Sequence, residues 1–164
     1  LMSLFRRYIK GEMKDLIQEG VRVRFIGDRP RLDDKLIKMM DDLEKVTAEN
    51  EKVHLTIALN YGGRDEVSRA VKEMARDAAL GTLDPETVDE TTLTRYLDTR
   101  VLPDPDLVIR TSGEARISNF LLWQSAYSEY EFIDTLWPDF TKDVFAECTA
   151  RYATRDRRFG AVKV

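Results

Sequence analysis

The chain has 164 residues, of which 43% are hydrophobic and 34% are charged, and its formal net charge is −4. This composition predicts a soluble globular protein and argues against a nucleic-acid partner held by a broad positive surface. A single cysteine excludes an internal disulfide, and no apolar run spans a membrane, so we expect a cytoplasmic protein with at most peripheral membrane contact.

Predicted helices and strands alternate along the chain. Apolar residues at helical spacing predict a first helix over residues 1–19, which Gly20 ends. The further predictions are a strand over 21–28, helices over 33–49, 65–80, 90–99, 117–130 and 140–155, and strands over 54–59, 106–110 and 132–136. Such alternation indicates an α/β fold with a mostly parallel central sheet flanked by helices, and no linker divides residues 1–164, so we expect a single domain.

Three predicted strands end in glycine or charge, in the stretches IGDRP, NYGGR and IRTSGE. Ligands of parallel α/β sheets gather outside the carboxyl ends of the strands. Glycine lets a ligand approach the backbone, and arginine with hydroxyl groups suits phosphate oxygens. These ends therefore predict a phosphate-binding edge.

Arg110 and Arg116 are the strongest candidates, because two guanidinium groups could share one diphosphate. Ser118 could add a hydroxyl at a helix N-terminus. The alternative is a structural ion-pair network of the two arginines with Glu114 or Asp106. The stretch Asn60-Tyr61-Gly62-Gly63-Arg64 is either a second ligand contact or only a tight turn between strand and helix, since it matches no nucleotide-binding motif.

Other candidates have equally plain structural alternatives. Glu129 suits Mg²⁺ held together with phosphates, or it is a surface residue. The basic cluster 155–160 is either a solvated tail or an anion contact. The aromatic residues form the core or a subunit interface; they are Phe120, Trp123, Tyr127, Phe132 and Trp137.

With these residues assembled, the chain resembles the cis-prenyltransferases, in particular the bacterial undecaprenyl diphosphate synthase family. The resemblance runs from Leu1 to about Gly160 and rests on several stretches in family order. They are VRVRFIGD, LNYGGRDEV, DLVIRTSGEARISNFLLWQSAYSEYEF, LWPDF and RDRRFG.

The resemblance implies an enzyme that adds isopentenyl diphosphate units to farnesyl diphosphate with Mg²⁺. The product is a long polyprenyl (undecaprenyl) diphosphate, the precursor of a lipid carrier for cell-wall glycan synthesis. It implies that Arg110, Arg116 and Ser118 hold isopentenyl diphosphate and that Glu129 helps to ligate Mg²⁺.

The resemblance also assigns the remaining site residues. Asn60, Gly62, Gly63 and Arg64 match the turn that shapes the edge of the active site. Arg158 and Gly160 match an Arg-x-Gly motif that reaches across a homodimer toward the partner's substrate. The expected product tunnel is lined by Leu1, Leu4, Val21, Val23, Val53, Leu55 and Ile57.

One departure from the family is large. The family domain opens with a strand and an Asp-Gly-Asn-x-Arg-Trp motif, whose aspartate is essential, and a second strand leads to a Phe-Ser-x-Glu-Asn motif. Neither motif occurs in residues 1–164. We therefore expect the C-terminal two-thirds of the family domain, without its first two strands and inactive alone. The alternative reading is a non-catalytic partner subunit or an inactive fragment of such an enzyme.

Overall fold

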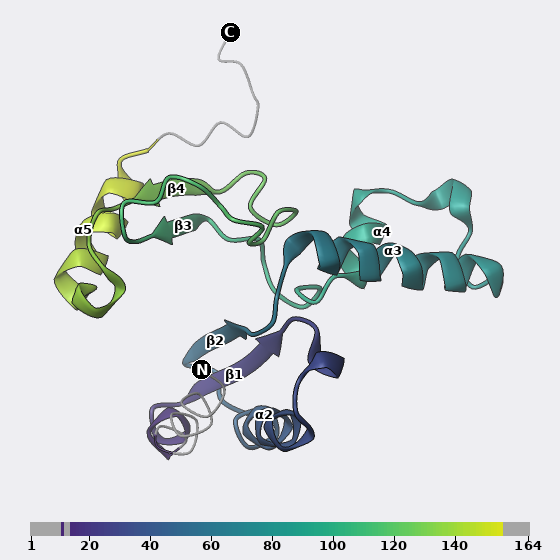
Figure 1. Cartoon of the computed structure of the whole chain (residues 1–164), viewed down its shortest axis with the longest axis horizontal. Helices are drawn as coiled ribbons and strands as arrows, with labels where there is room; N and C mark the ends of the chain where they lie inside the picture. The colour runs from purple at the N-terminus through teal and green to yellow at the C-terminus, as the bar shows by residue number, and fades with distance from the viewer. Residues whose placement is uncertain (1–10, 12–13, 156–164) are drawn as a thin grey trace, which may run out of the picture. The chain divides into compact units, whose positions relative to one another are not determined.

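The structure is a computed structural model, and it describes residue 11 and residues 14–155. Its elements divide into two compact units, of which the first ends at Arg100 and the second begins at Val101 (Figure 1). Each unit has its own two-stranded sheet, and both sheets are parallel. The fold is α/β with parallel strands and flanking helices, as predicted, whereas the expectation of a single domain over 1–164 stays a prediction.

The first unit combines one sheet with flanking helices. Its elements are β1 (Val21–Ile26), α2 (Asp34–Val46), β2 (Val53–Ala58), α3 (Gly63–Ala79) and α4 (Glu90–Tyr96), with short 3-10 turns at Arg29–Arg31 and Pro85–Thr87. The register of the sheet runs from Val21 opposite Val53 to Ile26 opposite Ala58.

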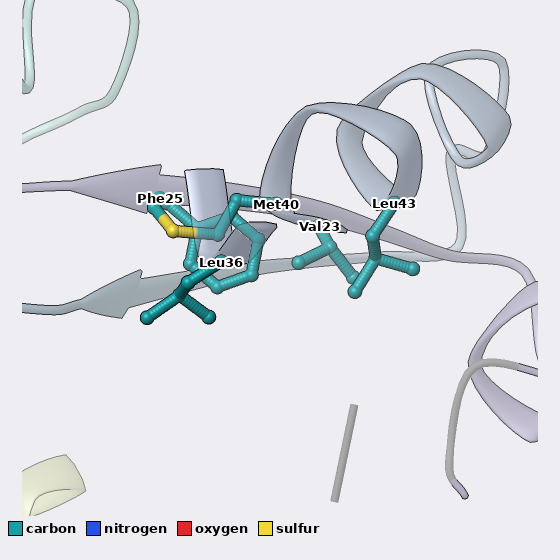
Figure 2. Close-up of a cluster of buried hydrophobic side chains, with 5 residues drawn as sticks. All are labelled: Val23, Phe25, Leu36, Met40 and Leu43. Carbon is teal, nitrogen blue, oxygen red and sulfur yellow. The ribbon is translucent and has the colours of Figure 1, made fainter. Parts of the chain in front are cut away.

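The hydrophobic core of the first unit lies between β1 and α2 (Figure 2). The side chain of Asp33 caps α2 by accepting from the Leu36 amide at 3.2 Å. Helical spacing then places three apolar residues on one face, where they meet Val23 and Phe25; they are Leu36, Met40 and Leu43. Each fully buried side chain of this kind contributes about 1.5–3 kcal/mol.

The two edges of the β1–β2 sheet differ. Side chains from outside the sheet close the outer edge of β1 through four bonds: Asn50 Nδ2 to Val21 O (2.9 Å), Val23 N to Thr47 Oγ1 (3.1 Å), Phe25 N to Glu44 Oε1 (2.7 Å) and Arg29 Nη2 to Phe25 O (3.2 Å). No side chain of the described residues closes the backbone of β2 in this way, and Val53 and Leu55 are 56% and 37% exposed. Within the described residues of the first unit, side chains thus bond to the outer edge of β1 and none bonds to the backbone of β2.

The second unit contains β3 (Leu107–Arg110), β4 (Glu129–Phe132) and α5 (Lys142–Ala153), with a 3-10 turn at Trp137–Asp139. Its register runs from Leu107 opposite Glu129 to Arg110 opposite Phe132. Thr141 caps α5 by accepting from the Val144 amide at 3.4 Å.

Two element predictions are wrong. The helix expected over 117–130 is a series of turns from residue 118 to residue 127, because Ser118, Asn119 and Leu121 have φ of 47°, 63° and 45°, and an α-helix needs negative φ. The strand expected over 132–136 instead begins at Glu129 and ends at Phe132.

The remaining predicted strands and helices are confirmed, with ends that differ by a few residues. Of the helix expected over 1–19, residue 11 and residues 14–18 are helical, and residues 1–10, 12 and 13 lie outside the described residues. No helix in the described part of the chain has both the length and the apolar composition to cross a membrane.

Candidate functional site

A cavity of about 200 Å³ opens beside the sheet of the second unit. It brings together the three residues predicted to bind diphosphate, which are Arg110, Arg116 and Ser118. Its apolar wall consists of Val108, Ile109, Ile117, Phe120, Tyr130 and Phe132. The rings of Tyr130 and Phe132 stack with centroids 5.8 Å apart. The cavity therefore combines two cations and a hydroxyl with a largely apolar surface.

The turn after β3 sets the geometry of this cavity. Arg110 ends β3, and the chain reverses through Ser112 and Gly113, whose φ values are 72° and 66°. Their amides donate to the carbonyls of Thr135 and Ile133, both at 2.9 Å, so the turn is held against the chain that follows β4. Backbone strain of this kind is concentrated at functional sites.

Both arginines of the cavity already have partners within the protein. Arg110 Nη1 donates to the carbonyl oxygen of Arg116 at 2.6 Å. Arg116 forms an ion pair with Glu114, which was one structural alternative at the sequence level. The Arg116 side chain is 64% exposed, so this ion pair is worth little in water. A diphosphate could replace Glu114 on Arg116 at small cost.

The second predicted contact, in the first unit, forms the turn between β2 and α3. Asn60 has φ of 52°, and its Nδ2 donates to Asp28 O at 2.9 Å. Gly62 precedes α3, Gly63 is its first residue, and Arg64 follows on an exposed face. Gly27, which follows β1, packs against this turn and leaves no room for a side chain, because its Cβ would lie 2.1 Å from Leu59 O.

Sequence reasoning missed the polar network that supports these turns. Asp98 Oδ2 accepts from Gly27 N at 3.0 Å, and both oxygens of Asp98 accept from Arg69, at 2.9 and 2.7 Å. Buried Glu66 accepts from the Asp98 amide at 2.9 Å and from the Tyr61 hydroxyl at 2.6 Å. The bonds from Asp98 raise the pKa of Arg69 above its ordinary value. Arg69 and Asp98 are 29 positions apart, so no local sequence signal indicates this pair.

The structure does not bring Glu129 into the cavity. Glu129 begins β4 opposite Leu107, three residues before the pair of Arg110 and Phe132. Side chains alternate between the faces of a strand. Because Tyr130 and Phe132 line the cavity, Glu129 points to the opposite face of the sheet.

On that face, Glu129 forms an ion pair with Arg155 at 3.0 Å. Its neighbour Glu131 pairs with both Arg151 and Arg155. Sequence reasoning missed these pairs, which join residues 20 or more positions apart. Within residues 14–155 no three His, Cys, Asp or Glu side chains are grouped to hold a metal ion.

The predicted tunnel residues of the described chain share one face of the β1–β2 sheet, because Val21 pairs with Val53, Val23 with Leu55 and Phe25 with Ile57. On that face Val23 is buried against α2 (Figure 2), whereas Val53 and Leu55 are exposed. Leu1, Leu4, Arg158 and Gly160 lie outside the described residues.

Two relatives of the chain are named as enzymes of prenyl diphosphate metabolism. The chain is 49% identical over 162 residues to an isoprenyl transferase of Agrobacterium fabrum, covering 99% of the chain and 66% of that protein. It is 46% identical to the decaprenyl diphosphate synthase of Mycobacterium leprae, covering 98% of the chain and 54% of that protein. The chain thus spans less than two thirds of the length of these relatives.

Solved structures show the same likeness. The crystal structure of a probable undecaprenyl diphosphate synthase from Campylobacter jejuni has a TM-score of 0.86 at 34% identity, over 97% of this chain and 72% of that one. Lavandulyl diphosphate synthase from Lavandula x intermedia, solved with dimethylallyl diphosphate, has a TM-score of 0.93 at 33% identity, over 98% of this chain and 70% of that one. Residues 1–160 match the profile of the family described as "Putative undecaprenyl diphosphate synthase", and the chain belongs to this prenyltransferase family.

Proposed function

We propose that the chain serves cis-prenyl transfer, in which isopentenyl diphosphate units are added to an allylic diphosphate such as farnesyl diphosphate. The observation that carries this proposal is the cavity in which Arg110, Arg116 and Ser118 face an apolar wall. A prenyl diphosphate has the matching halves, an anionic head and an apolar C5 unit. The proposed setting is the cytoplasm, and the proposed product is a long polyprenyl diphosphate of the undecaprenyl type.

The residues of the cavity would work by positioning. The forks of Arg110 and Arg116 suit the oxygens of one diphosphate, with Ser118 as an additional donor. The apolar wall of Phe120, Tyr130 and Phe132 would hold the alkene and keep water away while the allylic diphosphate leaves. The alkene carbon then bonds to the allylic carbon, and a proton is lost.

The described residues could hold Mg²⁺ only if a substrate supplied part of its ligands. Mg²⁺ is often bound through one or two carboxylates together with substrate phosphates, and Glu129 would supply one such carboxylate. When bound, Mg²⁺ would neutralise charge on the diphosphate. Because Glu129 faces away from the cavity of its own chain, we propose that it serves the diphosphate held by the second copy in a homodimer.

A condensation assay with labelled isopentenyl diphosphate, farnesyl diphosphate and Mg²⁺, with products sized by chromatography, tests the proposed reaction. Long polyprenyl products would support it. Absence of product together with tight binding of isopentenyl diphosphate would favour the non-catalytic partner subunit or inactive fragment. Absence of both product and binding would overturn the proposal.

The diphosphate site itself is tested by Arg116→Ala. Losing a hydrogen-bonded cation costs about 1.5–3 kcal/mol, or roughly 10- to 150-fold in the dissociation constant. We expect this loss for isopentenyl diphosphate, measured by calorimetry in EDTA, and little change for farnesyl diphosphate. Arg100→Ala removes the same charge at an exposed position outside the cavity and should change neither. Equal losses for both ligands would contradict the assignment of Arg116.

A further inference from the structure

Arg155, which lies two residues beyond the end of α5, makes contacts on β4 that Arg151 within α5 does not share. Its Nη1 donates to Glu129 Oε2 at 3.0 Å and to the Tyr130 carbonyl at 2.8 Å, and its Nη2 donates to Glu131 Oε2. One planar guanidinium thus joins two carboxylates and the strand backbone between them. Arg151 reaches Glu131 but not Glu129.

Of the two carboxylates, Glu131 is the more firmly held. Glu131 is 8% exposed, and two arginines hold its two oxygens. Glu129 is more open, with a side chain that is 31% exposed. Because Arg155 bonds to both carboxylates, the fixed position of buried Glu131 also restricts the more exposed carboxylate of Glu129.

The two carboxylate oxygens of Glu129 differ in their bonding. Arg155 takes Oε2, and no other donor among residues 14–155 bonds to Oε1. A carboxylate whose one oxygen is held by a guanidinium keeps a fixed orientation while the other oxygen stays available to a cation. Hydrogen-bonded partners of this kind orient metal-ligating carboxylates and tune their affinity for the metal.

We propose that Arg155 is a positioning residue, which holds Glu129 so that Oε1 is presented to a divalent cation. This inference rests on the proposed function, because it takes Glu129 as a ligand of the cation. It adds that the orientation of Glu129 depends on a bridge through Arg155 to the buried carboxylate of Glu131.

The variant Arg155→Lys tests the planar geometry of the guanidinium group separately from its positive charge. Arg155→Lys keeps the positive charge near the cation but lacks the planar fork that reaches both carboxylates. Arg151→Lys is the matched control, since it changes the neighbouring arginine of Glu131 and leaves the bond between Arg155 and Glu129. Denaturant unfolding of each variant measures its free energy of unfolding and shows whether it is still folded.

The test measures Mn²⁺ binding to the full chain by the loss of the free-ion EPR signal, in the presence of isopentenyl diphosphate. We expect Arg155→Lys to weaken Mn²⁺ binding about 10-fold and Arg151→Lys to change it less than about twofold. Isopentenyl diphosphate binding in EDTA should be unchanged in both variants. Glu131→Gln, which removes the buried anchor, should weaken Mn²⁺ binding in the same direction as Arg155→Lys.

The outcomes separate the two proposals. Unchanged or tighter Mn²⁺ binding in Arg155→Lys, with the diphosphate still bound, would overturn the role of Arg155 and leave the diphosphate site intact. Equal weakening in Arg151→Lys would also overturn it, because it would reduce the bridge to general packing of α5. Failure of the unmodified chain to bind isopentenyl diphosphate in EDTA would overturn the proposed function itself.

Discussion

Ser112 adopts a backbone conformation that suits glycine better than serine. Its φ is 72°, and its amide is already bonded to Thr135 O, so a glycine would keep that bond. The left-handed conformation costs a residue with a side chain about 1–2 kcal/mol, partly offset by the greater flexibility of unfolded glycine. We therefore expect Ser112→Gly to raise the free energy of unfolding by about 0.5–1 kcal/mol, measured with urea.

Ser68→Gly is the control for this prediction. Ser68 lies inside α3, where glycine is unfavourable, so the same exchange should lower the free energy of unfolding by about 0.5 kcal/mol. A loss of stability at both positions would show that the conformation of Ser112 costs nothing.

At the scale of elements, Thr47 joins α2 to the outer edge of β1. It is fully buried, and its Oγ1 accepts from Val23 N at 3.1 Å while donating to Leu43 O at 2.8 Å. Thr47→Val keeps the shape and leaves the buried Val23 amide without an acceptor, which costs about 1–3 kcal/mol. Chemical denaturation should show this loss.

Thr149→Val supplies the comparison for Thr47→Val. Thr149 also bonds to carbonyls of its own helix, at 3.1 and 2.8 Å, but its hydroxyl accepts from no backbone amide in the described chain. Its replacement should change stability by less than about 0.5 kcal/mol. Similar effects at both threonines would contradict the edge-closing role of Thr47.

Elements held by local signals could be predicted from the sequence. The cap at Asp33 and the spacing of Leu36, Met40 and Leu43 both indicate α2. The segment 117–130 misled prediction because its apolar residues resemble a helix, whereas positive φ at Ser118 and Leu121 makes it a chain of turns. The spacing of apolar residues carries no information about these backbone angles.

The candidate site divides in the same way. Arg110, Arg116 and Ser118 lie within nine residues of one another, so the end of one strand predicts their proximity. The pair of Arg155 with Glu129 depends on how α5 packs on β4, and 26 residues separate the two. The face on which Glu129 lies follows only from the start of β4, which the sequence pattern misplaced.

At the scale of the whole molecule, we predict that the edge of β2, to which no side chain of residues 14–155 bonds, is a surface for association. Unpaired strand edges with apolar side chains join other strands readily, whereas β1 is closed by side chains. We expect the chain to form species larger than a dimer at high concentration, and Val53→Lys to suppress them, as measured by light scattering after size-exclusion chromatography.

Val46→Lys is matched to this variant in residue type and exposure, since Val46 is 52% exposed and lies on α2 rather than on the open strand. It should leave the larger species in place. Equal suppression by both variants would point to net charge, and no suppression by Val53→Lys would show that the edge of β2 does not mediate association.

Both arginines of the cavity already bond to groups of the protein. An anion that enters the cavity would therefore have to replace these partners. For a diphosphate to bind as proposed, Arg110 would give up or share the carbonyl of Arg116, and Arg116 would release Glu114. Chloride or acetate has too few oxygens and too little charge to replace both contacts at once, whereas a diphosphate has enough of each. Under the proposed function, the cavity would therefore prefer a multiply charged anion, which can bond to both arginines at once, over small singly charged ions.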